Sequence, residues 1–299
     1  AACWAPPAAG LRPEAGQQGL RGGQRRFGPS RFRSKKAATT PAPTYHGLPL
    51  YYEGHVPGHF FNMSYYAKQD FYFRIEKWHN LVAGRKECHP PMPGEKVIYF
   101  IQHGDNLGNT LSKLGSEEEK DGKLWELGEE QARNLAIDPM LARAIAGAPS
   151  ERAQLVVTSP ARKAMQTALL GLGGALANAT WEVDADIDGF GLEGIHGNPV
   201  PELGAAMLAE LGHTTLLRKY KELPQGWEKD ARDGKKKWQA FVQRLLERPE
   251  RNIILVTHNQ VIKLAGYSKV HSGEVRISAL SPSGELHKIS APDCWPVTL

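Results

Sequence analysis

The stretch that decides the fold is Lys96–Gly104, which reads KVIYFIQHG. Its residues Val97–Ile101 are β-branched, aromatic or aliphatic without interruption, a composition typical of a buried strand. Gln102, His103 and Gly104 follow at once, so polar groups that can bind or react lie at the carboxyl end of that strand. The stretch therefore predicts a buried strand that ends in a histidine.

Strands and helices alternate through the rest of the chain. We predict further strands at 154–158, 181–184 and 253–257, and a closing hairpin formed by 275–280 and 285–289. We predict helices at 127–146 with a bend near Pro139, at 159–176, at 203–217, along the apolar face of 238–246, and at 260–265. In the second helix, Ser159 is expected as the cap and Pro160 as the first residue. This alternation predicts an α/β fold, a three-layer α/β/α sandwich with a mostly parallel sheet and helices on both faces.

Two other strand ends resemble that of the first strand in their chemistry. The strand at 253–257 is followed by His258 and Asn259, and the strand at 154–158 is followed by Ser159 at the start of a helix. In sheets of this kind ligands bind at the carboxyl ends of the strands. A helix N-terminus attracts phosphate through its unpaired N–H groups, and histidine can act as a nucleophile or an acid–base group. We therefore expect one crevice that holds two histidines and a helix start.

The composition excludes several classes of protein. The chain has 299 residues, of which 41% are hydrophobic, and its mean hydropathy is −0.43. No apolar run approaches the length that a membrane span needs, so we expect no membrane partner. The three cysteines, Cys3, Cys88 and Cys294, lie far apart, which excludes a disulfide scaffold and a multi-cysteine zinc site. His55 and His59 are spaced as metal ligands on a helix, but Pro57 breaks that helix, so no metal site is expected there.

The basic charge is confined to one end of the chain. Residues 1–45 hold eight basic residues and one acidic residue, whereas the whole chain has a net charge of +5. The remainder is therefore nearly neutral, and we expect no nucleic acid among the partners.

These observations divide the chain into three parts. Residues 1–45 are predicted to be a disordered basic tail or a transit-like leader. Residues 46–95 are crowded with Tyr and Phe and are predicted to be an extension packed on the main domain, with a helix near 64–79. Residues 96–299 form the main domain. The expected location is cytoplasmic, or organellar if 1–45 is a transit peptide.

Four elements in series carry a family resemblance. They are Gln102–Gly104, Leu124–Ala132 (LWELGEEQA), Ser159–Ala168 (SPARKAMQTA) and Leu255–Asn259 (LVTHN). In this order they are similar to the Arg-His-Gly, Leu-Thr-x-x-Gly-x-x-Gln-Ala and Ser-Pro-Leu-x-Arg-Ala-x-x-Thr-Ala elements and the second-histidine strand of the histidine phosphatase superfamily, whose fold is phosphoglycerate-mutase-like. The resemblance covers about residues 96–290 and leaves out the first 95.

The resemblance implies a phosphomonoester phosphatase that acts on a small phosphorylated substrate through a phosphohistidine, without a cofactor or metal. His103 would attack phosphorus, and His258 would stabilise the charge on the phosphoryl oxygens. A carboxylic acid would protonate the leaving oxygen. That role is assigned to Glu193, with Glu202 and Asp105 as alternatives. Nothing in the sequence indicates an oligomeric state.

Phosphate binding is assigned to Gln102, Asn109 and Lys163. The two family arginines, before the first histidine and on the Ser-Pro helix, correspond to Gln102 and Lys163 in this chain. Arg162 is adjacent but should point elsewhere, because one residue turns a helix by about 100°. Arginine offers phosphate a two-pronged donor that neither replacement provides. A catalytically impaired pseudophosphatase, acting as a phosphate-ligand-binding or interaction protein, is therefore the alternative. Phosphoglycerate mutase activity is less favoured, because no separate carboxylate-binding residues are evident.

Residues Gly189–Gly194 also fit the glycine pattern G-x-G-x-x-G of dinucleotide-binding proteins. That pattern should open a helix directly after a strand. Gly197, Pro199 and Pro201 follow instead, so we expect a loop that carries Glu193 over the crevice.

Overall fold

The structure is a computed structural model of the chain, and it describes residues 91–106, 121–189, 199–230, 232–268 and 270–289. The tail predicted at 1–45 and the helix predicted near 64–79 lie outside the described residues. So does nearly all of the extension predicted at 46–95. Those expectations stay predictions.

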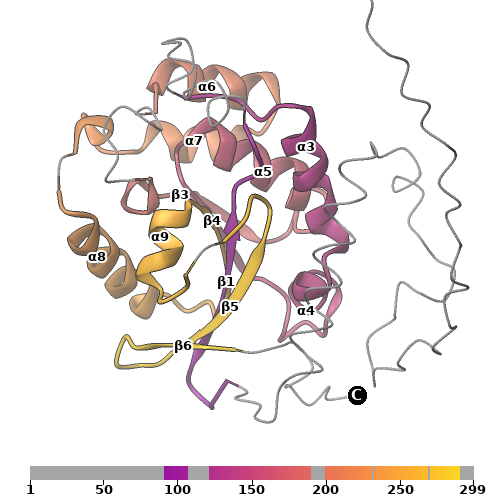
Figure 1. Cartoon of the computed structure of the whole chain (residues 1–299), viewed down its shortest axis with the longest axis vertical. Coiled ribbons are helices and arrows are strands. Elements are labelled where there is room, and N and C mark those ends of the chain that lie inside the picture. Colours follow the sequence, from indigo (N-terminus) through magenta and orange to yellow (C-terminus); the bar gives the residue numbers. More distant parts are fainter. Residues whose placement is uncertain (1–90, 107–120, 190–198, 231, 269, 290–299) are drawn as a thin grey trace, which may run out of the picture. The chain divides into compact units, whose positions relative to one another are not determined.

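A single six-stranded sheet organises the described residues (Figure 1). Its order is β3-β2-β4-β1-β5-β6, in which the first four strands run parallel and the last two are antiparallel. The mostly parallel sheet predicted from the sequence is therefore confirmed. The strands are β1 (Lys96–Gln102), β2 (Leu155–Thr158), β3 (Thr180–Val183), β4 (Asn252–Thr257), β5 (Val275–Leu280) and β6 (Leu286–Lys288).

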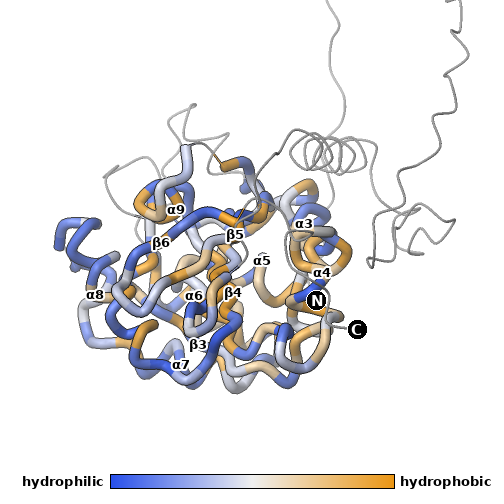
Figure 2. Tube along the Cα trace, turned by 90° about the horizontal axis from the view of Figure 1, so that it is seen from below, coloured by the Kyte–Doolittle hydropathy of each residue, from blue (hydrophilic) through white to orange (hydrophobic). Residues whose placement is uncertain are grey.

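Side chains of β1 alternate between two apolar cores, one on each face of the sheet. Tyr99 and Ile101 face the core that includes residues of α5 (Arg162–Leu172), whereas Ile98 and Phe100 face the core built with α8 (Gly234–Glu247). In the hydropathy view the central strands are largely orange and the outer side of α8 is blue (Figure 2). The three-layer arrangement is confirmed, and it explains why the first strand is apolar at five successive positions.

The remaining helices follow the prediction with local differences. The segment predicted as one helix with a bend near Pro139 consists of a helix, two short 3₁₀ turns and a second helix. The helices and turns are α3 (Glu126–Arg133), η4 (Asn134–Ile137), η5 (Pro139–Leu141), α4 (Ala142–Ala146), η6 (Ala185–Ile187), α6 (Pro201–Glu210), α7 (Thr214–Lys221), η7 (Trp227–Lys229) and α9 (Asn259–Leu264).

The helix predicted at 203–217 is wrong as one element. It divides into α6 and α7 because Gly212 has a φ of +69°, a left-handed conformation that ends a helix. Tyr220 of α7 packs onto Gly204 of α6, where an added Cβ would overlap with the phenol oxygen. The break thus lets two short helices fold against each other.

Ser159 is not the cap of α5, contrary to the prediction. The helix begins at Arg162 after Ala161 and ends at Leu172 rather than at 176. The Ser159 hydroxyl still accepts a hydrogen bond from the Ala161 N–H at 3.2 Å, but it also has partners away from the helix. Those partners belong to the site described below.

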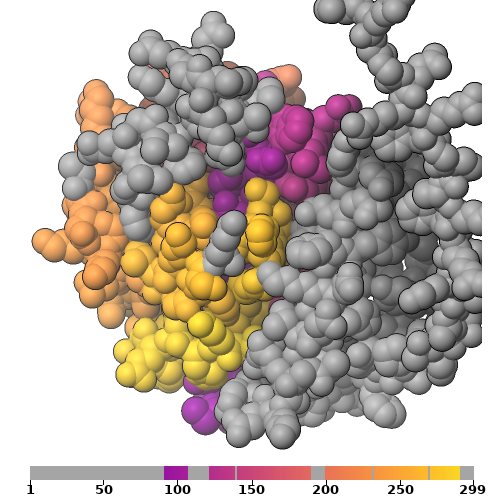
Figure 3. Space-filling view, viewed as in Figure 1, coloured from indigo at the N-terminus to yellow at the C-terminus, as the bar shows by residue number. Residues whose placement is uncertain are grey.

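Within the described residues, no helix is long and apolar enough to cross a membrane. The β5–β6 hairpin and α8 lie at the surface in the space-filling view, coloured yellow and orange (Figure 3). This agrees with the position of β6 at one edge of the sheet.

Candidate active site

Two histidines meet at the carboxyl ends of the neighbouring strands β1 and β4. Gln102 and Thr257 are register partners, so the residues that follow them, His103 and His258, emerge side by side. Their ring centroids are 4.9 Å apart with an interplanar angle of 63°, and each residue is only 4% exposed. The convergence expected from the two strand ends is present in the structure.

The His103 ring has a defined tautomer. Its Nδ1 lies 2.7 Å from the carbonyl oxygen of Gly104, which can only accept a hydrogen bond, so Nδ1 carries the proton. In the neutral ring, Nε2 therefore keeps its lone pair. The Gln102 Nε2 lies 3.4 Å from that atom. Of the two ring nitrogens, Nε2 is thus the one whose chemistry suits a nucleophile.

The turn after His103 is held by close backbone packing. An added Cβ at Gly104 would overlap with the carbonyl oxygen of Gly128 in α3, and one at Gly128 would overlap with the carbonyl oxygen of Asp105. The Gly104 N–H donates to Thr167 Oγ1 of α5 at 2.9 Å, and the Asp105 N–H donates to Gln131 Oε1 of α3 at 2.8 Å. Two helices thus fix the backbone that sets the His103 tautomer.

His258 contacts a serine and a carboxylate through a single nitrogen. Its Nε2 lies 2.9 Å from Ser159 Oγ and 3.2 Å from Asp188 Oδ1, and the Ser159 hydroxyl donates to that same Asp188 oxygen at 2.9 Å. A serine-hydrolase triad needs the acid and the serine on opposite ring nitrogens, so this is not one. Burial lowers the pKa of His258, and the neighbouring Asp188 opposes that shift.

The segment that carries Asp188 is anchored to β4 and to α8. Thr257 donates its hydroxyl hydrogen to the Ile187 carbonyl at 2.6 Å. Arg244 of α8 forms ion pairs with Asp184 at 2.7 Å and with Asp186 at 2.8 Å.

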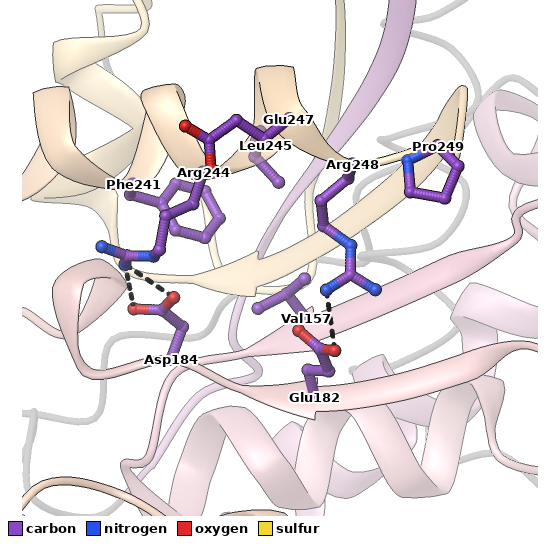
Figure 4. Close-up of a pocket in the computed structure, with 9 residues that line it drawn as sticks. All are labelled: Val157, Glu182, Asp184, Phe241, Arg244, Leu245, Glu247, Arg248 and Pro249. Atoms are coloured by element: carbon purple, nitrogen blue, oxygen red, sulfur yellow. Dashed lines mark hydrogen bonds and ion pairs between the residues drawn. The ribbon is translucent and has the colours of Figure 1, made fainter.

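Beside this anchor lies a pocket of about 390 Å³ (Figure 4). Arg244 of α8 and Arg248, which directly follows that helix, point to Asp184 and to Glu182 of β3 across it. Neither histidine lines the pocket. We therefore interpret its two ion pairs as supports for the segment that leads to Asp188.

Lys163 brings a buried positive charge to the N-terminal turn of α5. The residue is 3% exposed, and its ammonium group forms no hydrogen bond or ion pair with the part of the chain that the structure describes. Burial lowers the pKa of Lys163, while the negative charges of Asp188 and Asp121 oppose that shift.

Arg162, next to Lys163, is directed at Asp121 instead. Its Nε lies 3.5 Å from Asp121 Oδ2, and its backbone N–H donates to Asp121 Oδ1 at 2.9 Å. Asp121 also accepts a hydrogen bond from the Val200 N–H at 3.1 Å, and burial raises its pKa. The two basic residues therefore face different surroundings, as the helical turn of about 100° per residue predicts.

The structure brings together only part of the predicted site. His103, His258, Gln102 and Lys163 gather around the end of the sheet, whereas Glu193 and Asn109 lie outside the described residues, as does nearly all of the loop predicted at 189–194. Of the two alternatives to Glu193, Glu202 is exposed on α6, and the Asp105 carboxylate accepts a hydrogen bond from the adjacent Asn106 N–H.

Sequence reasoning missed Asp188, Asp121 and Thr257. Asp188 follows closely after the end of β3, so the strand-end argument that identified His103 and His258 also applies to it. Asp121 and Thr257 act through backbone groups distant in sequence, and no local pattern marks them.

Comparison with known protein families gives a match. The family model described as the histidine phosphatase superfamily (branch 1) matches residues 98–275, a span that includes both histidines. No curated protein matches the sequence significantly.

Several solved structures are similar to part of this chain. The phosphoglycerate mutase from Bacillus anthracis is 16% identical with a TM-score of 0.44, and 66% of this chain and 94% of that chain are covered. The ecdysone phosphate phosphatase from Bombix mori is 16% identical with a TM-score of 0.43, covering 66% and 93%. A mycobacterial glucosyl-3-phosphoglycerate phosphatase is 18% identical with a TM-score of 0.41, covering 66% and 99%.

Proposed function

Because this chain belongs to the histidine phosphatase superfamily (branch 1), we propose that it hydrolyses phosphate monoesters through a phosphohistidine formed at His103. The observation that carries this proposal is the contact between His103 Nδ1 and the Gly104 carbonyl oxygen, which leaves the lone pair on Nε2. A nucleophile needs such a lone pair together with a fixed orientation.

In the first step, His103 Nε2 attacks phosphorus and the bond between phosphorus and the ester oxygen breaks. A carboxylic acid gives its proton to that oxygen, so a neutral alcohol leaves. In the second step, water attacks the phosphohistidine and the N–P bond breaks. The carboxylate takes the proton from the water, which restores the acid and the neutral His103 and releases inorganic phosphate.

The acid is proposed from two candidates. Glu193 is the residue assigned from the family resemblance, and Asp188 is supported by its 3.2 Å contact with His258 Nε2. Such a group must reach the leaving oxygen, and it contributes about 10²–10⁴-fold to the rate.

Charge on the transferred phosphoryl group is proposed to be balanced by His258 and Lys163. Phosphoryl transfer depends mostly on positioning and on such electrostatic stabilisation. The ammonium of Lys163, which has no hydrogen-bonding partner among the described residues, is suited to the oxygens of a bound phosphoryl group. Asn109 remains a proposed contact to the same group.

The second candidate function is phosphate-ligand binding with little or no turnover. It is favoured by Gln102 and Lys163, which occupy positions assigned to arginines in the family. Hydrogen bonds to charged groups contribute about 1.5–3 kcal/mol each. Weakening two of them could slow turnover by roughly 10²–10⁴-fold.

Hydrolysis of p-nitrophenyl phosphate separates the two functions. The phosphatase proposal expects turnover by the parent protein and at least a hundredfold loss in His103→Ala. Equal rates in the two proteins would overturn it, and phosphate binding without turnover would support the second candidate.

Two substrates with different leaving groups can identify the residue that acts as the acid. Removing the acid should slow glycerol phosphate, whose alkoxide leaves poorly, far more than p-nitrophenyl phosphate. Asp188→Asn and Glu193→Gln, compared on both substrates, assign the role to whichever variant shows this difference.

A further inference from the structure

Gln102 holds a buried acceptor that the proposed reaction leaves unused. The residue is 8% exposed, and its Oε1 has no hydrogen-bond partner among the described residues. Leaving a buried acceptor unpaired costs about 1–3 kcal/mol, so its place beside the nucleophile calls for a functional explanation.

The orientation of this amide follows from the His103 tautomer. Since Gly104 fixes the proton on Nδ1, His103 Nε2 can only accept, and Gln102 must turn its NH₂ group toward it. The carbonyl oxygen Oε1 then becomes the end without a partner. The two terminal atoms of one amide are about 2.3 Å apart, so Oε1 lies within about 6 Å of His103 Nε2.

That distance places Oε1 within reach of the oxygens of a phosphoryl group at Nε2. An acceptor facing a fully ionised phosphoryl group meets only other acceptors and repels them. A singly protonated phosphoryl group offers a P–OH donor, which satisfies Oε1. An arginine in the same place offers donors only and would favour the dianion.

The charges around the described site also favour a singly protonated phosphoryl group. Among the described residues, Lys163 is a buried cation whose charge acts on both Asp188 and His258, whereas Arg162 is paired with Asp121. Asp188 adds a carboxylate next to His258. One cation balances a monoanionic phosphoryl group better than a dianionic one.

On this basis, and resting on the proposed function, we propose that the site takes its phosphoryl group as the monoanion, with the P–OH hydrogen donated to Gln102 Oε1. The substrate class is therefore a singly protonated phosphate monoester. Gln102 is the residue that selects this ionisation state.

Binding of inorganic phosphate and of sulfate to the full chain, measured by calorimetry, tests the assignment. The two anions have the same shape, but sulfate carries no proton to donate. Titration of the protein also changes the affinity for sulfate, which is a dianion at both pH values, so sulfate serves as the internal control. Several titratable or charged groups lie around the proposed phosphoryl position beside His103 Nε2. They are His103 at the end of β1, His258 before α9, Asp188 after η6, Lys163 and Arg162 of α5, and Asp121.

At about pH 5.5, where phosphate is mainly monoanionic, we expect phosphate to bind at least tenfold more tightly than sulfate. At about pH 8.5 that preference should disappear. Gln102→Met, similar in size but without an acceptor, should lose the preference at pH 5.5. Gln102→Arg should strengthen binding of sulfate and of dianionic phosphate.

Equal binding of both anions at pH 5.5 by the parent protein would overturn the inference without depending on any variant. A preference retained by Gln102→Met would also overturn it, because another group would then receive the proton. Hydrolysis that is lost in His103→Ala would leave the proposed function standing in either case. Absence of both anion binding and His103-dependent hydrolysis would overturn the proposed function itself.

Discussion

The ammonium group of Lys163 lies where burial disfavours its positive charge and lowers its pKa. The aspartates that oppose this effect, Asp188 and Asp121, act at longer range than a direct ion pair. A buried charge of this kind lowers the stability of the folded protein, and its presence supports the proposed role of Lys163 in binding an anion.

Lys163→Met should therefore raise the free energy of unfolding near pH 7, by about 1–2 kcal/mol, while weakening phosphate binding. Because the pKa of Lys163 is lowered in the folded protein, the unfolded chain binds this proton more readily below the ordinary value of about 10.4. The gain should thus shrink as the pH rises toward that value. Urea unfolding across this range measures it.

Arg162→Met is the matched control, since it removes a neighbouring cation that does have a partner. It should lower the free energy of unfolding, by about 1–3 kcal/mol, because Asp121 loses its ion pair. Equal effects of the two substitutions would contradict the distinction between Lys163 and Arg162.

His258 makes stability depend on pH in a defined direction. Its folded pKa lies below the ordinary value of about 6.5. Between that value and the lower folded pKa, the unfolded state binds a proton that the folded state does not. Stability should fall as the pH drops through this window, and His258→Gln should remove that part of the loss. Urea unfolding at pH 7.5, 6.5 and 5.5 measures the difference, and parallel curves would contradict it.

The sequence could predict the residues that follow buried strands but not their partners. His103 and His258 are visible because each ends an apolar run. The role of Ser159 was misassigned to a helix cap, because its hydrogen bonds to Asp188 and His258 join positions about 30 and 100 residues away. Such contacts depend on the tertiary fold and leave no local periodicity.

Helix α3 lies so close to the turn after β1 that no side chain fits at Gly128. The contact between Gly128 and the Asp105 carbonyl sets how closely α3 can approach the residues that follow His103.

The prediction of helices from the sequence failed at one place. The apolar pattern of 203–217 continues across Gly212, so periodicity alone did not reveal the turn between α6 and α7.

Gly128→Ala should lower the free energy of unfolding by about 3 kcal/mol or more and abolish hydrolysis, because the new Cβ would displace the Asp105 backbone. Gly174→Ala is the control, since nothing lies within 4 Å of a Cβ at that position. It should change stability by no more than about 0.5 kcal/mol. Thermal unfolding compares them, and a tolerated Gly128→Ala would refute the packing argument.

The hydrogen bond from Thr257 to the Ile187 carbonyl ties the end of β4 to the segment that carries Asp188. Thr257→Val keeps the shape but removes the donor, so it should lower stability by about 1–3 kcal/mol. The same change should reduce kcat more than it raises KM. Thr257→Ser restores the donor and should recover most of the kcat. A loss of equal size in both variants would assign the effect to packing.

At the scale of the whole molecule, β4 is an inner strand of the sheet and β6 is an edge strand. It pairs with β1 on one side and with β2 on the other, whereas β6 pairs only with β5 at the edge. The order of strands could not be read from the sequence, because apolar runs identify strands without specifying their neighbours.

A chain that ends after Glu247 should therefore lose cooperative unfolding, since it lacks β4 and the hairpin. A chain that ends after Ser281 loses β6 and should keep one cooperative transition at a lower midpoint. Circular dichroism during urea unfolding distinguishes them. A cooperative transition in the shorter chain would contradict the central place of β4.

The pairing of β1 with β4 joins two strands that are made at different times during synthesis. His103 leaves the ribosome well before its partner strand, because His258 follows 155 positions later in the chain. A nascent chain grows from its N-terminus, so β1 waits without its parallel neighbour while most of the domain is translated. The proposed nucleophile is therefore made long before the histidine that lies beside it in the folded domain, so the proposed hydrolysis must wait until nearly all of the domain has emerged.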